Sequence, residues 1–211
     1  MPIDHVLFAV RDPAAAARRL SAEHGLSGVP GGLHPAWGTG NWIVPLGSSY
    51  LELVHVVDPG LAARTPFGQR VSAVLRAGGG PFAWCVRPAD FEATVRRLGL
   101  TAGEGSRRRP DGVTLAWRTA GLEVALGDPS RPFFIDWQVP PADHPGASAA
   151  GHGIAPAGIA SVDLCGDGAV IRAWLGEEAL PVTIRPGSPA VAGVEIGTAD
   201  GPIHLAATAV R

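Results

Sequence analysis

The sequence contains no lysine, and all 17 basic side chains are arginines. Charged residues make up only 17% of the 211 residues, and the formal net charge is −2. This balance excludes a strongly basic protein, so neither nucleic acid nor an anionic membrane is an expected partner. The abundance of alanine, glycine and arginine is typical of GC-rich bacterial coding sequences.

Cysteine is also scarce, and the two thiols, Cys85 and Cys165, lie in separate apolar runs. A disulfide framework and a cysteine metal site are therefore not expected, and both thiols are predicted to be buried and reduced. No apolar run is long enough to span a bilayer, and Asp4, His5 and Arg11 interrupt the apolar start. A cytoplasmic protein is the expectation.

Several familiar catalytic signatures are missing as well. The sequence has no glycine-rich phosphate loop with its lysine, no nucleophile elbow and no redox cysteine pair. Hydrophobic residues nevertheless make up 46% of the chain, which is enough for a sizeable core. The organisation of the chain is therefore more informative than any single motif.

The same local pattern begins three times along the chain: a strand-like run, an aspartate, a helical run and a glycine. An aspartate at this place caps the start of a helix, and a glycine ends it. We interpret the pattern as duplicated β-α-β-β-β modules, the third incomplete. The three beginnings are "AVRDPAAAARRL", "CVRPADFEATVRRLG" and "DLCGDGAVIRAWLG".

The remaining runs complete the modules. "NWIVPLG" and "SYLELVHVV" are predicted strands joined by a tight turn, "SRRRPDGVTLAWRT" is a predicted hairpin with a Pro-Asp-Gly turn, and "LEVALG" and "RPFFIDWQV" close the second module. The predicted organisation is a first module, a connecting helix, a second module, a linker and a partial third module packed on the first two. Their ranges are residues 1–58, 59–79, 80–139, 140–157 and 158–211.

Three segments, "IDHVLFAVRD", "GGLHPAWGTGNWIVPLGSSYLELV" and "PFFIDW", resemble the vicinal-oxygen-chelate superfamily, and more narrowly its glyoxalase-like domain proteins. The resemblance covers roughly residues 1–139. It implies an α+β fold in which paired βαβββ modules curl mixed sheets around a concave pocket, with the tail as an extra partial module. In metal-dependent members, a His or Glu on the first strand and a Glu on the fourth strand of each module hold one divalent ion. That ion binds two neighbouring substrate oxygens.

His5 and Glu52 are the candidate metal ligands of the first module. Strand alternation puts Val6 and Phe8 on the core side, so His5 is expected to face the pocket. Glu52 is an acid within an apolar strand, and its burial is costly unless it is paired or bound. The two residues could share a metal ion or a hydrogen bond.

The second module departs from the family pattern. It places Pro81 or Phe82, neither of which can bind a metal, at the first-strand position and Asp136 at the fourth-strand position. The predicted metal set is therefore His5, Glu52 and Asp136, which suits zinc, manganese, nickel or magnesium. A second histidine for a 2-His-1-carboxylate iron site is not found in this set, which argues against an extradiol dioxygenase.

Other candidates lie in "LHPAWGTGNW" and its surroundings. His34 could act with Glu52 as an acid or base, could complete the metal site, or could be an exposed loop residue. Asn41 could bind a substrate carbonyl or belong to a turn. At most two of Trp37, Trp42, Trp84 and Trp117 are expected to touch a ligand, with Trp37 and Trp117 as the candidates. The three consecutive arginines at 107–109 are read as a solvated hairpin or as a means of steering an anion.

Two functions from different classes follow. The first is a metal-dependent lyase or isomerase acting on a compound with vicinal oxygens. The alternative is a metal-free protein that binds and sequesters a small molecule, as in antibiotic resistance; a structural or regulatory domain with a vestigial pocket is a third reading. In each functional reading the partner is a small molecule, and the chain is a monomer or a homodimer.

Overall fold

The computed structural model describes residues 1–109, 111–176 and 179–210. The first module runs in the order strand, helix and three strands. Asp12 caps the helix by accepting a hydrogen bond from the Ala15 amide at 2.9 Å, and Gly25 ends it at a φ of +68°. The elements are β1 (Ile3–Ala9), α1 (Pro13–His24), β2 (Val29–His34), β3 (Thr39–Pro45) and β4 (Tyr50–Val56).

The second module repeats this order with one added helix. Asp90 caps its first helix by accepting from the Ala93 amide at 2.8 Å. The elements are β5 (Gly80–Val86), α4 (Phe91–Leu98), β6 (Ala102–Arg108), β7 (Thr114–Ala120), α5 (Leu122–Gly127) and β8 (Phe133–Trp137). Pro110, in the expected Pro-Asp-Gly turn between β6 and β7, lies outside the described residues.

The segment "LEVALG", expected to close the second module, forms the helix α5. Gly121 turns the chain at a φ of +79° directly before it. Leu122, Ala125 and Leu126 then have the spacing of one helical face, and they pack into the inner core.

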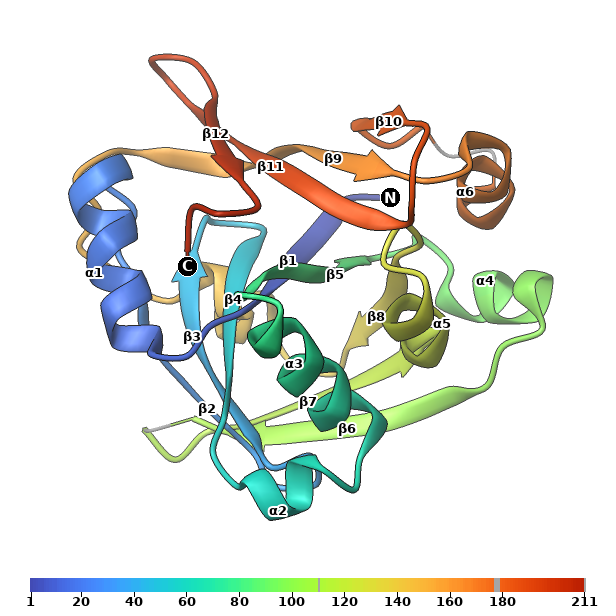
Figure 1. Ribbon diagram of the computed structural model, residues 1–211, viewed down its shortest axis with the longest axis horizontal. Coiled ribbons are helices and arrows are strands. Elements are labelled where there is room, and N and C mark those ends of the chain that lie inside the picture. The colour runs from blue at the N-terminus through green and yellow to red at the C-terminus, as the bar shows by residue number, and fades with distance from the viewer. Residues whose placement is uncertain (110, 177–178, 211) are drawn as a thin grey trace.

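The two modules join into one eight-stranded sheet of order β2-β3-β4-β1-β5-β8-β7-β6. In each module the first strand pairs in parallel with the last, and β1 pairs antiparallel with β5 at the centre. The sheet curls until its outer strands meet, where Arg107 of β6 donates a hydrogen bond to the Gly31 carbonyl of β2. Figure 1 shows the curled sheet. The predicted fold class, an α+β fold of paired βαβββ modules around a concave pocket, is confirmed.

Two separate apolar cores lie on the two faces of this sheet. The inner core, which includes Leu7 and Phe82, is filled in part by helices from the connection between the modules. That connection was expected to be one helix, and it forms two, α2 (Pro59–Ala62) and α3 (Pro66–Arg76). The outer core contains Val6, Phe8 and Trp84, and α1 packs against it.

The C-terminal residues form a second sheet that shares the outer core, with Val162, Leu164 and Val194 packed into it. Two short 3-10 turns, Pro141–Asp143 and Pro145–Ala147, precede this unit. In Figure 1 its long strands pass over β1 and β5, between α1 and α6. The elements are β9 (Pro156–Cys165), α6 (Gly168–Leu175), β10 (Val182–Arg185), β11 (Ala190–Thr198) and β12 (Ile203–Ala206).

This unit repeats the order of a module along the chain but not its strand pairing. Its first strand, β9, lies in parallel beside the second strand, β10, and antiparallel to β11, whereas β1 and β5 pair in parallel with the last strand of their modules. Among the described residues, no helix is both long enough and apolar enough to cross a membrane.

Candidate active site

A recess opens on the concave side of the sheet, and the first module supplies its polar end. Four adjacent strands each turn one polar side chain inward: His34 from β2, Asn41 from β3, Glu52 from β4 and His5 from β1. All four are buried, with Glu52 only 6% exposed. Alternation along each strand and the order of the strands are therefore sufficient to bring these residues together.

Glu52 lies at the centre of this polar end. Its Oε1 accepts a hydrogen bond from Asn41 Nδ2 at 2.5 Å and lies 3.7 Å from His34 Nε2. Its Oε2 lies 3.6 Å from His5 Nε2. The carboxylate is thus held by an amide on one oxygen, while each oxygen faces an imidazole at a distance slightly longer than a hydrogen bond.

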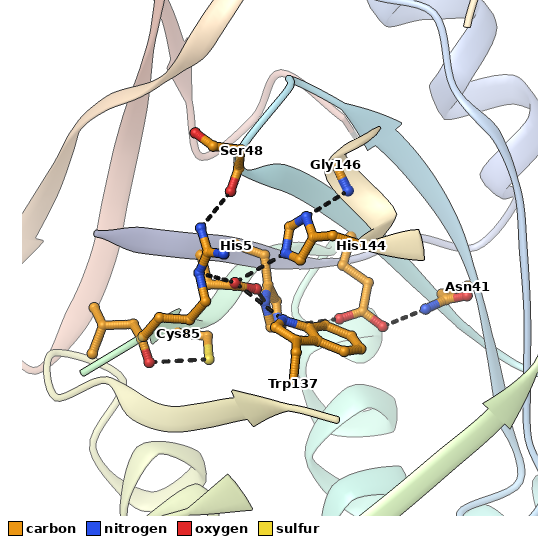
Figure 2. A network of polar contacts seen from close by, with 11 residues as sticks. His5, Asn41, Ser48, Cys85, Trp137, His144 and Gly146 are labelled. Atoms are coloured by element: carbon orange, nitrogen blue, oxygen red, sulfur yellow. Dashed lines mark hydrogen bonds and ion pairs between the residues drawn. The ribbon is translucent and has the colours of Figure 1, made fainter. Parts of the chain in front are cut away.

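Asp4 holds His5 from behind. His5 Nδ1 lies 2.6 Å from Asp4 Oδ1, and His144 Nε2, Trp137 Nε1 and Arg87 Nε lie 3.1, 3.2 and 2.9 Å from Oδ2 (Figure 2). Burial alone raises the pKa of Asp4, but the hydrogen bonds from His144 and His5 outweigh it and hold this pKa well below its usual range. Asp4 is therefore an ionised acceptor.

The ionised Asp4 fixes the direction in which His5 acts. Since Asp4 can only accept, Nδ1 of His5 carries a hydrogen, and Nε2 points toward Glu52 and the recess. A carboxylate behind a histidine in this way orients the ring and strengthens it as a ligand or base. Tyr50 adds to this by stacking on the imidazole with ring centroids 4.5 Å apart.

His34 is the second imidazole of the recess, and its environment keeps it neutral. Burial is the largest cause that lowers the pKa of His34 to about 4. Its Nδ1 lies 3.1 Å from Thr39 Oγ1, and Asn41 Nδ2 lies 3.4 Å from Nε2. Because the amide donates toward Nε2, that nitrogen is the acceptor and faces Glu52 and the recess.

The rest of the recess is mostly apolar, and the second module supplies most of it. The recess is narrow, since the space that the centre of a water-sized sphere can occupy in it measures about 40 Å³. One charged side chain, Arg107 of β6, interrupts this wall. The apolar lining consists of Leu7, Trp37, Phe67, Trp117, Leu122, Phe133, Ile135 and Trp137.

Of the candidate residues from the sequence, the recess brings together His5, His34, Trp37, Asn41, Glu52 and Trp117. Asp136 is not among them. Phe133, Ile135 and Trp137 occupy the inward positions of β8, so alternation turns Asp136 to the other face, where it pairs with Arg118 Nη2 at 2.5 Å. Trp42 and Trp84 pack in the outer core. Asp136 is therefore dropped from the set of candidate ligands.

Sequence reasoning did not assign Asp4, Tyr50, Trp137 and His144 to the site, and it considered Arg107 only as part of an arginine run that could steer an anion. Asp4 and Tyr50 could have been found, because they lie beside His5 in the sequence or share the alternation of Glu52. Arg107 is the middle residue of a run of three arginines, and alternation in β6 buries it while Arg108 stays exposed. No local signal reveals His144, whose contact with Asp4 spans 140 positions.

Two sets of residues could hold a metal ion. The first is His5, Glu52 and His34: the two Nε2 atoms lie 3.6 and 3.7 Å from different oxygens of the carboxylate, and among the described residues this set does not bring three ligand atoms within 4.8 Å of one another. The second is Asp4, His5 and Cys85, whose ligand atoms lie within 4.8 Å of one another. In that set burial raises the pKa of the Cys85 thiol, and Asp4 already has four partners. The first set lines the recess, but its side chains would have to move closer together to share one ion.

The comparisons with known proteins agree with this architecture. A family model described as "Glyoxalase-like domain" matches residues 3–178. A crystal structure of a hypothetical protein from Staphylococcus aureus superimposes with a TM-score of 0.63 at 14% identity, covering 97% of this chain and 85% of that one.

Weaker matches include two epimerases. Methylmalonyl-CoA epimerase from Mycobacterium tuberculosis gives a TM-score of 0.45 at 17% identity, over 64% of this chain and 86% of that chain. A Streptomyces coelicolor methylmalonyl-CoA epimerase in complex with 2-nitronate-propionyl-CoA gives 0.45 at 16%, over 64% and 94%. At 14% identity, the Staphylococcus aureus structure shows a shared fold alone. A search of curated proteins finds no match.

Proposed function

The chain belongs to the glyoxalase-like domain family of the vicinal-oxygen-chelate superfamily, and on this premise we propose that it moves a proton on a small molecule with two neighbouring oxygens, as an isomerase or a lyase. The observation that supports this most is the polar end of the recess. A carboxylate and two imidazoles converge at the end of an apolar cavity, although burying them is costly unless they serve a ligand.

A divalent ion, such as zinc, manganese, nickel or magnesium, is part of the proposal. His5 Nε2 and the Glu52 carboxylate would hold it, with His34 Nε2 as a third ligand or as a base. When bound, such an ion polarises a substrate carbonyl and stabilises negative charge on its neighbouring oxygen.

The protein's own groups would do the remaining work. Asp4 fixes the His5 ring, so that Nε2 points into the recess. Asn41 holds Oε1 of Glu52 and leaves Oε2 facing the cavity. His34, neutral and with its Nε2 unprotonated, can accept a proton from a bound substrate, and the aromatic wall keeps water away from that step.

The alternative, a metal-free protein that sequesters its ligand, is favoured by one observation. The β8 residues that line the recess are apolar and β5 supplies none of its lining, so among the described residues the second module contributes no histidine or carboxylate to the polar end. Under this alternative the His5–Glu52 pair binds ligand oxygens directly.

Metal analysis separates the two functions. Protein purified without chelator or metal-affinity resin is assayed for bound ions, and chelator-treated protein is titrated with each of the four metals by calorimetry. We expect one ion per chain in the wild type, loss of binding in Glu52→Gln and unchanged binding in the control Asp136→Asn. If the wild-type protein binds none of the four metals, the metal-dependent function is contradicted and the sequestering function is favoured.

Proton transfer is tested separately. Metal-loaded protein is incubated in D₂O with a panel of 2-hydroxy and 2-oxo compounds, and NMR follows deuterium incorporation next to the carbonyl. We expect incorporation with the wild type and its loss in His34→Asn. Metal binding without any exchange or conversion would argue against the catalytic function.

A further inference from the structure

Arg107 stands out among the charged residues of the recess because no carboxylate pairs with it. It is 5% exposed and lines the recess together with Glu52, His34 and Tyr50. Within the described parts of the chain, no acidic group lies within ion-pair distance of its guanidinium, and its hydrogen bond is the one from Nη1 to the Gly31 carbonyl. The other N–H groups of a guanidinium, which has five, are therefore left for the cavity.

The neighbouring arginines are placed differently. Arg108 is exposed on the other face of β6, and its Nε donates to the Gly112 carbonyl at 3.3 Å. Arg109 pairs with Asp111 and lies 3.5 Å from Asp143. Arg107 thus differs from both in being buried, without an acidic partner and directed at the recess.

A buried cation of this kind is costly unless a partner of opposite charge completes it. Glu52 and Tyr50 interact with it only at longer range, and Glu52 is already engaged with Asn41 and the two imidazoles. A guanidinium matches a carboxylate in shape, because two of its N–H groups bind both oxygens side by side. The missing partner therefore has the chemistry of a carboxylate or a similar oxyanion.

We propose that Arg107 is the anion-binding group of the recess and that the ligand is a small monocarboxylate with an aromatic or branched aliphatic body. This rests on the proposed function, which supplies a second oxygen beside the carboxylate as the group that meets His5 and Glu52. The apolar body then packs on the wall formed by Trp37, Trp117 and their neighbours.

The charges of the site agree with a monoanion. Asp4 and Arg87 form an ion pair, whereas Glu52 lies beyond ion-pair distance of Arg107. A divalent ion at His5 and Glu52 would leave the site positive, and an anionic ligand reduces this excess. A neutral ligand would leave it uncompensated in a largely apolar cavity.

The test compares an acid with its neutral amide. Binding of mandelate and mandelamide, and of 2-hydroxyisocaproate and its amide, is measured by calorimetry on chelator-treated and on metal-loaded protein. In the wild type we expect each acid to bind at least roughly tenfold more tightly than its amide, as a charge-assisted pair requires. R107Q should remove this preference, R107K should keep part of it, and R108Q, which changes the neighbouring exposed arginine, should leave it intact.

Two outcomes would overturn the proposal. One is equal affinity of acid and amide for the wild type, and the other is failure of both acids to bind at millimolar concentration. Since R107Q also loses the hydrogen bond to Gly31, melting curves accompany each variant, and the wild-type comparison needs no variant at all. A preference for the acid that persists in chelator-treated protein supports anion binding by Arg107 even if no metal binds. The anion-binding proposal and the proposed metal-dependent function can therefore fail separately.

Discussion

The His5 ring uses its two nitrogens on opposite sides: Nδ1 faces Asp4 in the core and Nε2 faces Glu52 in the recess. Replacing His5 by Ala removes the nitrogen that faces the recess and also one of the four polar partners of Asp4. We expect metal or ligand binding to be lost, with a moderate loss of stability of about 1–3 kcal/mol from the partner lost by the buried Asp4. Calorimetry and denaturant unfolding measure the two effects.

The matched control for that variant is Phe8→Ala on the same strand. Phe8 is fully buried in the outer core and does not line the recess. Its truncation should cost about 3–5 kcal/mol and leave the affinity of the folded fraction unchanged. If His5→Ala behaved like Phe8→Ala, His5 would be a packing residue and not a binding one.

His34 leads to a prediction on pH. Burial lowers its pKa from the ordinary 6.5 to about 4, so between these pH values the unfolded chain binds a proton that the folded chain does not. Stability of the chelator-treated protein should therefore fall as pH drops from 6.5 to 4, by up to about 3 kcal/mol from this residue. Urea unfolding across this range should show a shallower dependence in His34→Asn; an unchanged slope would contradict the burial argument.

A different group governs the more acidic range. The pKa of Asp4 is lowered in the folded state. Its contribution to the stability of the folded state is therefore present above pH 3.8 and is lost as the pH falls further. The two residues therefore weaken the fold in successive pH windows, and the His34→Asn variant removes the upper one alone.

At the scale of elements, the short turn Pro145–Ala147 connects the linker to the site. His144 reaches Asp4 because Gly146 packs against the β3–β4 turn, where an added Cβ would lie 2.4 Å from the Ser49 carbonyl. We expect Gly146→Ala to displace His144 and to cost about 1–3 kcal/mol. Gly151→Ala, where a Cβ meets nothing within 4 Å, is the control, and thermal unfolding of both variants gives the comparison.

Alternation along strands predicted much of the candidate site. Polar residues inside apolar runs, such as His5 and Glu52, can be assigned to a face once their neighbours Val6, Phe8, Leu51 and Leu53 are recognised as core. The same reasoning misplaced Asp136, because both faces of β8 carry aromatic residues and the sequence does not show which face is the inner one. Resemblance to the family then favoured placing Asp136 on the inner face of β8, whereas it lies on the outer face.

Contacts between distant segments were beyond reach of the sequence. The helix α5 begins after a turn at Gly121, which the sequence analysis did not identify. The pairing of β9 with β10, and the contact of His144 with Asp4, depend on how separate units pack, which no local pattern encodes. The capped helices, in contrast, follow from aspartate and glycine positions alone.

At the scale of the whole molecule, the outer core joins the C-terminal sheet to both modules. Leu164 and Val194 share one apolar cluster with Phe8 and Trp84. Leu164→Ala should therefore lower the stability of the entire chain by about 2–5 kcal/mol while preserving a single unfolding transition, whereas Val170→Ala, at an exposed position, should have little effect. Calorimetric scans that resolve two transitions would show that the C-terminal sheet unfolds by itself.

The two halves of the sheet line the recess with different kinds of residues, and this affects what substitutions in each half would do. Its reactive groups come from strands β1 to β4, while most of the wall and Arg107 come from β6 to β8. Substitutions in the second half can alter which compound is accepted without disturbing the groups that would act on it. In a duplicated fold of this kind, one half would supply the groups of the proposed function, and the other half would determine which ligand fits. Changes in the second half alone would then alter the ligand specificity.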